Sequence, residues 1–125
     1  MELGKPILFA ATADAPRSRK FYTEVLGLDF VADEQFALVF NMGEMMLRIQ
    51  KVEIHSPPPY TVLGWQTNDI ATTIDALTER GVAFERYDFM EQDERGIWRP
   101  PGEGAHIAWF KDPDGNTLSL TQFLF

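Results

Sequence analysis

The chain contains no cysteine, which excludes disulfide bonds, thiolate nucleophiles and cysteine-ligated zinc. It has no apolar run approaching the roughly 18 residues of a membrane span, and no secretory signal at its start. Basic residues are outnumbered by acidic ones, and the net charge of −8 gives a surface that repels nucleic-acid phosphates. These absences indicate a cytoplasmic protein that binds neither membranes nor nucleic acid.

Apolar and aromatic residues are plentiful instead. Hydrophobic residues make up 45% of the 125 positions and include ten phenylalanines, enough to build a core without covalent cross-links. The length predicts one domain. Its two halves repeat one plan, strand–helix–strand–strand–strand, which assigns module one to about residues 5–54, a proline-rich linker to 55–59 and module two to about 60–125.

Each module is predicted from the same signals. A buried apolar strand comes first, and an aspartate then caps a helix that ends at a glycine. Three strands follow, separated by turn residues. In module one the strand covers 6–11, the helix runs from Asp14 to Gly27 and the later strands cover 28–32, 36–40 and 45–51. In module two the corresponding segments are 61–66, Asp69 to Gly81, 82–89, 106–111 and 116–123.

One stretch departs from this plan. Residues 91–105 are rich in glycine and proline and carry Trp98 between Gly96 and Pro100. Loops of this length in compact domains are commonly lids or binding loops. A tryptophan in such a loop suggests a lid, a dimer contact or simple packing onto the sheet.

Two segments carry a family resemblance. Residues 21–28, Phe-Tyr-Thr-Glu-Val-Leu-Gly-Leu, and 109–116, Trp-Phe-Lys-Asp-Pro-Asp-Gly-Asn, resemble the hallmark segments of the vicinal oxygen chelate superfamily. That superfamily includes glyoxalase I, extradiol dioxygenases and bleomycin resistance proteins. The resemblance covers about residues 6–123 and implies an α+β fold of two βαβββ modules, curled as mixed sheet around a cleft, in a protein that is commonly a homodimer.

The resemblance also implies a place for a divalent metal ion. Metal-using members carry a His or Gln on the first strand and a Glu on the last strand of each module. The matching positions here are Ile7, Val62, Ser119 in Leu-Ser-Leu, and Arg48 in Leu-Arg-Ile. The two histidines, His55 and His106, lie elsewhere. The sequence therefore predicts no metal, no cofactor and no catalytic residue of the family's type.

Strand alternation selects the residues expected to face the cleft. Arg48 could grip an anion through its guanidinium fork, or pair with an acid such as Glu44 or a loop carboxylate. Trp109 could stack on a planar ligand or serve only as core. The ligand-binding residues predicted on this basis, with the loop tryptophan added, are Phe9, Arg48, Gln50, Gln66, Trp98, Trp109, Ser119 and Thr121.

The function that best fits these features is metal-independent binding of a small organic molecule in the inter-module cleft, to sequester or carry it. An enzyme, a lyase, isomerase or oxygenase with a non-standard site, is the first alternative. A protein-interaction module with a vestigial cleft is the second. The acidic net charge favours a cationic ligand and Arg48 an anionic one, so the ligand's charge stays open.

Overall fold

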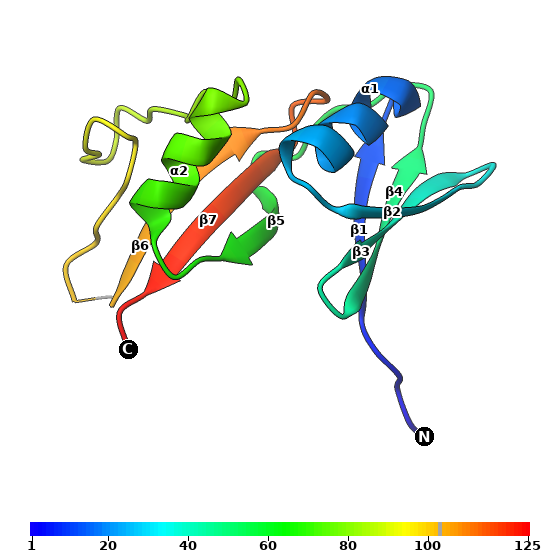
Figure 1. Ribbon diagram of the computed structural model, residues 1–125, viewed down its shortest axis with the longest axis horizontal. Coiled ribbons are helices and arrows are strands. Elements are labelled where there is room, and N and C mark those ends of the chain that lie inside the picture. Colours follow the sequence, from blue (N-terminus) through cyan, green and yellow to red (C-terminus); the bar gives the residue numbers. More distant parts are fainter. Residues whose placement is uncertain (103) are drawn as a thin grey trace. The chain divides into compact units, whose positions relative to one another are not determined.

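The structure is a computed structural model that describes residues 1–102 and 104–125 (Figure 1). The chain forms two compact units. The first unit contains Met1–Pro57 together with Pro113–Asn116, and the second contains Pro58–Asp112 together with Thr117–Phe125. Each unit holds one sheet and is described by itself. The cleft expected between the modules stays a prediction.

The first unit has the predicted βαβββ plan. Its sheet has four strands in the order β1-β4-β3-β2, in which β1 and β4 run parallel and the other pairs are antiparallel. The elements are β1 (Ile7–Thr12), α1 (Ala15–Lys20), the π-helical turn η1 (Phe21–Val25), β2 (Asp29–Asp33), β3 (Ala37–Met42) and β4 (Met45–Lys51).

The helix forms where its cap and stop signals predict it. The Asp14 side chain accepts a hydrogen bond from the backbone N–H of Arg17 at 3.3 Å, and Pro16 lies in the first turn, where a missing N–H costs little. The helix widens into η1 before it ends ahead of Gly27, whose φ of +69° suits glycine. Tyr22, within η1, is fully buried and its ring lies 5.8 Å from that of Phe40.

Alternation along the strands divides the first sheet as predicted. Leu47 and Ile49 are fully buried with Phe40 on the core face. Arg48 and its neighbours of the same parity lie on the opposite face, where Phe9 is directly across from Arg48 in the register. This second face is exposed at β1, where half of the Phe9 surface remains accessible, and buried at β3, where Val39 pairs with Arg48.

The second unit has a shorter sheet. Its three strands lie in the order β5-β7-β6, with β5 parallel and β6 antiparallel to β7. The helix α2 buries Ile70, Ile74 and Leu77, the apolar stripe expected from its sequence. The elements are β5 (Thr61–Gln66), α2 (Ile70–Glu79), β6 (Ala105–Lys111) and β7 (Thr117–Phe123).

The strand predicted over 82–89 is wrong. Two short pieces lie along the free edge of β6 instead: Phe84 forms a bridge with Phe110, and Trp98 forms one with Ile107. Between them the chain leaves the sheet, because the Gln92 side chain supplies hydrogen bonds that a strand ladder would otherwise make. Its Oε1 accepts from the backbone N–H of Tyr87 at 2.7 Å, and its Nε2 donates to the carbonyls of Glu85 at 3.0 Å and Gly96 at 2.8 Å.

The turn Pro113–Asn116 belongs to the first unit although it joins two strands of the second. Asp114 accepts hydrogen bonds from the Thr12 hydroxyl at 2.6 Å and from the Ala13 N–H at 2.8 Å. Asn116 donates to the Ala11 carbonyl at 2.9 Å, and its Oδ1 lies 2.7 Å from Nε2 of His55. The Asp-Pro-Asp-Gly-Asn segment thus ties the turn to the end of β1, and it gives His55 a structural contact.

Candidate functional site

One face of the second sheet carries most of the residues predicted for binding. The cross-strand register places side chains of β6, β7 and β5 in three rows on this face, since paired residues point to the same side. The rows are Lys111, Thr117 and Thr61; then Trp109, Ser119 and Gly64; then Ile107, Thr121 and Gln66. Hydroxyl groups therefore follow one another along β7, beside a tryptophan and a lysine on β6.

Aromatic rings extend this face beyond β6. The bridge between Trp98 and Ile107 places Trp98 on the same side as Trp109, and the two ring centroids lie 6.0 Å apart with 35° between the planes. Tyr87 packs edge-on against Trp109 at 5.7 Å, and Phe89 lies 5.6 Å from Tyr87. We call Trp98, Trp109, Tyr87 and Phe89 the aromatic row. Phe89 is 82% exposed, so the row ends in solvent.

An open pocket of about 410 Å³ lies against the aromatic row. Among the described residues that line it, the side chains with polar groups are two threonines, Tyr60, Tyr87, Trp109 and Lys111, and none of them is a carboxylate. The Trp109 Nε1–H donates to the Thr61 hydroxyl at 3.2 Å. The pocket is lined by Pro59, Tyr60, Thr61, Tyr87, Phe89, Met90, Trp109, Lys111 and Thr117, all in the second unit.

Trp98 lines a separate cavity of about 350 Å³ on the loop. Acidic and basic side chains both line it, and they include Glu91, Asp93 and Arg99. Asp93 and Arg99 already bind each other, with 2.7 Å between Oδ2 and the guanidinium nitrogen. Two of the charged side chains that line this second cavity are therefore already used in an ion pair within the loop.

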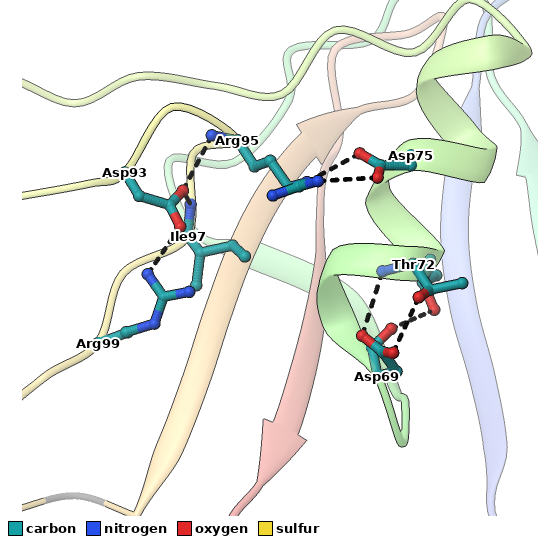
Figure 2. Close-up of polar contacts among 8 residues, drawn as sticks. Asp69, Thr72, Asp75, Asp93, Arg95, Ile97 and Arg99 are labelled. Carbon is teal, nitrogen blue, oxygen red and sulfur yellow. Dashed lines mark hydrogen bonds and ion pairs between the residues drawn. The ribbon is translucent and has the colours of Figure 1, made fainter.

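The loop that carries Trp98 is held by ionic hydrogen bonds (Figure 2). One Asp93 oxygen accepts from the backbone N–H groups of Arg95 and Ile97, both at 2.9 Å, and the Arg86 guanidinium donates to the Asp93 carbonyl. Arg95 reaches α2 and binds both oxygens of Asp75, at 2.9 and 3.0 Å. The segment predicted as a lid or binding loop is thus bonded at both its base and its tip.

These contacts lower the pKa of two carboxyl groups, Asp93 of the loop and Asp75 of α2. The hydrogen bond from Arg95 lowers the pKa of Asp75 below its usual 3.8. For Asp93, partial burial is the largest influence and raises the pKa, but hydrogen bonds from Arg99, Ile97 and Arg95 together outweigh it and the pKa is lowered. In contrast, burial, with a smaller contribution from the charge of Glu85, raises the pKa of Tyr87 above 10.0, so its hydroxyl keeps its proton. Asp75 and Asp93 are therefore both ionised at neutral pH.

The first sheet brings together the other predicted residues. Phe9, Arg48 and Gln50 lie on its exposed face. The Arg48 guanidinium binds Glu34 at 2.8 Å, with 28% of the arginine and 50% of the glutamate side chain exposed. The partner is thus a carboxylate of the β2–β3 loop, one of the two possibilities that the sequence leaves open, and Glu44 is not the one. Much of the charge that would attract an anion is already neutralised.

Sequence reasoning missed eight of the nine described residues that line the 410 Å³ pocket. Lys111 could have been found, because it has the same strand parity as Trp109. Tyr87 and Phe89 could not, since the segment 82–89 is not a strand and alternation therefore does not apply to it. Of the predicted residues only Trp109 lines the 410 Å³ pocket. Gln66, Ser119 and Thr121 lie on the same face, in the adjoining rows.

The family model that matches the chain is described as Glyoxalase/Bleomycin resistance protein/Dioxygenase superfamily, and it covers residues 7–120. The chain belongs to this superfamily. The recognition from the two hallmark segments is therefore confirmed. None of the curated proteins searched matches this superfamily member in sequence.

Solved structures support the fold of this superfamily member. A glyoxalase family protein from Bacillus anthracis matches with a TM-score of 0.72 at 14% identity, with 98% of each chain covered. A genomically encoded fosfomycin resistance protein from Listeria monocytogenes gives 0.74 at 14% identity, with 98% of this chain and 94% of that one covered. A lactoylglutathione lyase from Agrobacterium tumefaciens gives 0.69 at 16% identity, with 96% and 95% covered. At these identities the likeness concerns the fold.

The metal site implied by the superfamily does not fit the residues of this member. Ile7 and Val62 are hydrocarbon, Ser119 is a weak neutral donor, and Arg48 is a cation that would repel a metal ion. The described residues 1–102 and 104–125 contain no group of three His, Cys, Asp or Glu side chains that could hold an ion. In that same part of the chain, no helix is long and apolar enough to cross a membrane.

Proposed function

We propose that this superfamily member binds a small organic molecule without a metal ion, to sequester or carry it, on the aromatic face of its second unit. The observation that supports this most is the aromatic row beside a pocket of about 410 Å³. Small-molecule pockets span roughly 300–1,000 Å³ and combine apolar walls with a few polar groups. The pocket matches that description in size and in lining.

Exposure of the rings supports the same proposal. Phe89 is 82% and Tyr60 65% exposed although both adjoin other apolar groups of the pocket. Leaving such surface in water forgoes about 25 cal/mol for every Å² that a ligand would cover. The loop bonds of Gln92 and Asp93 support it further, because a site whose walls are held in place loses less entropy on binding.

The proposal also retains the exposed face of the first sheet, with Phe9, Arg48 and Gln50, as a second place of contact. A homodimer in the cytoplasm remains the expected setting. No described residue favours the enzyme alternative. His106 is paired with Gln122 across the strands, and Gln122 accepts a hydrogen bond from the N–H of Ile70 at the start of α2. This histidine therefore lies on the helix side of the sheet, away from the pocket.

A ligand screen with two matched variants tests the proposal. Thermal unfolding is measured against a library of metabolites and drugs, since a bound ligand stabilises by RT ln(1 + [L]/Kd). Phe89→Ala removes an exposed ring of the aromatic row, and Phe36→Ala removes a ring that is 71% exposed in the first unit. We expect ligands that stabilise the wild type to bind severalfold more weakly to Phe89→Ala and unchanged to Phe36→Ala.

Three outcomes would contradict the proposal. The first is a library in which no compound raises the melting temperature. The second is a set of ligands that bind Phe89→Ala as well as wild type. The third is protein purified without chelators that contains one divalent metal ion per chain.

A further inference from the structure

Lys111 is the one charged residue among the described residues that line the pocket on the second sheet. Building on the proposed function, we infer that the ligand is a planar aromatic carboxylate. Its carboxylate binds Lys111 and the Thr61 hydroxyl of the same row, and its ring packs against Trp109, Tyr87 and Phe89. The inference names the ligand class. The proposed function requires only that some organic molecule binds there.

The first step concerns charge. Lys111 is exposed, lines the pocket and makes no ion pair with any residue in 1–102 or 104–125. Four other cations of the chain are paired with acids: Lys51 with Asp33, Arg48 with Glu34, Arg95 with Asp75 and Arg99 with Asp93. Lys111 instead lies among apolar groups and hydroxyls, and no carboxylate is among the described residues that line its pocket. It provides a local preference for an anion.

The second step concerns hydrogen bonding at the charged end. The Thr61 hydroxyl accepts the indole N–H of Trp109 at 3.2 Å, which leaves its own proton to be donated to another acceptor. A hydroxyl that already accepts one hydrogen bond is a stronger donor of the next. Lys111 and Thr61 lie in the same row of the sheet, with Thr117 between them. An ammonium group and a hydroxyl so placed suit the two oxygens of a carboxylate.

The third step excludes the opposite charge. Rings such as Trp109, Tyr87 and Phe89 also attract cations, and aromatic cages bind quaternary ammonium ligands. Here a cation would come close to the Lys111 ammonium group, and the lining residues that the structure describes include no carboxylate to offset that repulsion. The acidic net charge does not reverse this, because charges farther than about 8 Å are largely screened at physiological ionic strength.

The pocket also favours a ligand with a single negative charge. A single lysine with hydroxyl donors compensates one negative charge, whereas phosphate dianions are usually bound by arginine forks or by several N–H groups. No arginine is among the described residues that line the pocket, and Arg86 and Arg99 of the second unit already bind Asp93. A monoanionic carboxylate is therefore favoured over a phosphate.

Three probes with one ring system and different charges test the inference. Isothermal titration calorimetry compares naphthoate, naphthalenemethanol and naphthylmethylammonium, substituted at the same ring position. We expect naphthoate to bind about tenfold more tightly than the alcohol, equal to about 1.4 kcal/mol, and the ammonium compound to bind most weakly. Raising the salt concentration should narrow the difference between naphthoate and the alcohol, because the ion pair is near solvent.

Variants then assign the preference to Lys111. Lys111→Met keeps the aliphatic stem and removes the charge, and it should bind naphthoate and the alcohol equally. Lys111→Arg should retain the preference. Lys5→Met removes a charge from an exposed residue of the first unit and is the matched control, with binding expected to stay as in wild type.

The possible failures are distinguishable. Binding of all three probes that is weakened in Phe89→Ala supports the proposed binding function. The carboxylate inference is nevertheless wrong if naphthoate then binds no more tightly than the alcohol, or if Lys111→Met keeps the preference for naphthoate. If the ammonium compound binds most tightly, the inference is likewise wrong, since the site then selects cations. If none of the three binds and the library screen is also negative, both the inference and the proposed function fail.

Discussion

The two sheets of this chain follow one plan and differ at one edge. The first unit completes four strands, and its cations Arg48 and Lys51 are neutralised by Glu34 and Asp33. In the second unit the corresponding strand is replaced by two single-residue bridges and a loop fixed by Gln92. Lys111 of this unit lies beside aromatic rings and has no ion pair with residues 1–102 or 104–125. The second unit thus has a pocket at the edge where its backbone makes fewer strand-to-strand hydrogen bonds than the first unit does.

The largest loss of unfolding free energy should come from core substitutions, which also test whether the two units unfold together. We propose that the chain is one cooperative domain, because the turn Pro113–Asn116 of the first unit joins β6 and β7 of the second. Phe40 and Phe110 are fully buried, one in each unit. Replacing either by alanine should cost about 4 kcal/mol of unfolding free energy.

All three tryptophans lie in the second unit, so their fluorescence reports its unfolding. For one cooperative domain, Phe40→Ala must shift the fluorescence transition in urea as much as Phe110→Ala does. The milder Phe40→Leu and Phe110→Leu variants serve if the alanine forms do not fold. Should Phe40→Ala leave the fluorescence midpoint unchanged, the units unfold independently and the single-domain proposal is wrong.

The next effect concerns the edge that distinguishes the two sheets. Gln92→Ala leaves the N–H of Tyr87 and the carbonyls of Glu85 and Gly96 without their partner, so we expect a loss of about 3 kcal/mol. Urea unfolding measures this loss, and amide hydrogen exchange should accelerate across residues 84–98 but not in β1 to β4. Gln35→Ala, at an exposed position of the first unit, is the control. Equal stability losses in the two variants would contradict the role given to Gln92.

A smaller effect tests whether the first sheet shares in binding. Exposed ion pairs contribute roughly 0–1 kcal/mol, so Arg48→Met should change the unfolding free energy by less than about 1 kcal/mol. Because Glu34 already neutralises Arg48, naphthoate affinity measured by calorimetry should fall by less than about threefold, an energy of under 1 kcal/mol. A tenfold fall would instead place Arg48 in the ligand site, as the sequence first suggested.

The smallest effect is a change of stability with pH in the loop and its contact with α2. Asp75 and Asp93 have lowered pKa values in the folded protein, so their contribution to stability is present above the usual value of 3.8 and is lost as pH falls through the lowered value. Below about pH 4 we expect Trp98 fluorescence to change before β-sheet circular dichroism does. Asp93→Asn should flatten that early change. A profile identical to wild type would show that Asp93 does not hold the loop.

The regular elements were predictable because local signals agree with the packing. Asp14 and Asp69 cap the helices as expected, and the alternation of Leu47, Arg48 and Ile49 sorts the first sheet correctly. The error over 82–89 has a cause that strand periodicity does not contain: the side chain of Gln92 makes hydrogen bonds with backbone groups that the apolar pattern assigned to a ladder. The pocket was only partly visible for the same reason, since Tyr87 and Phe89 are positioned by that loop and not by strand periodicity.

Gly64 and Ser119 have a consequence for how this site could change over time. A Cβ atom on residue 64 would come within 2.6 Å of the Ser119 hydroxyl, so the two small residues leave each other only just enough space beside Trp109. A carboxylate side chain introduced at position 119 would extend over this patch and cover part of the aromatic face. A single substitution that adds a metal ligand at position 119 would therefore work against binding on the aromatic face.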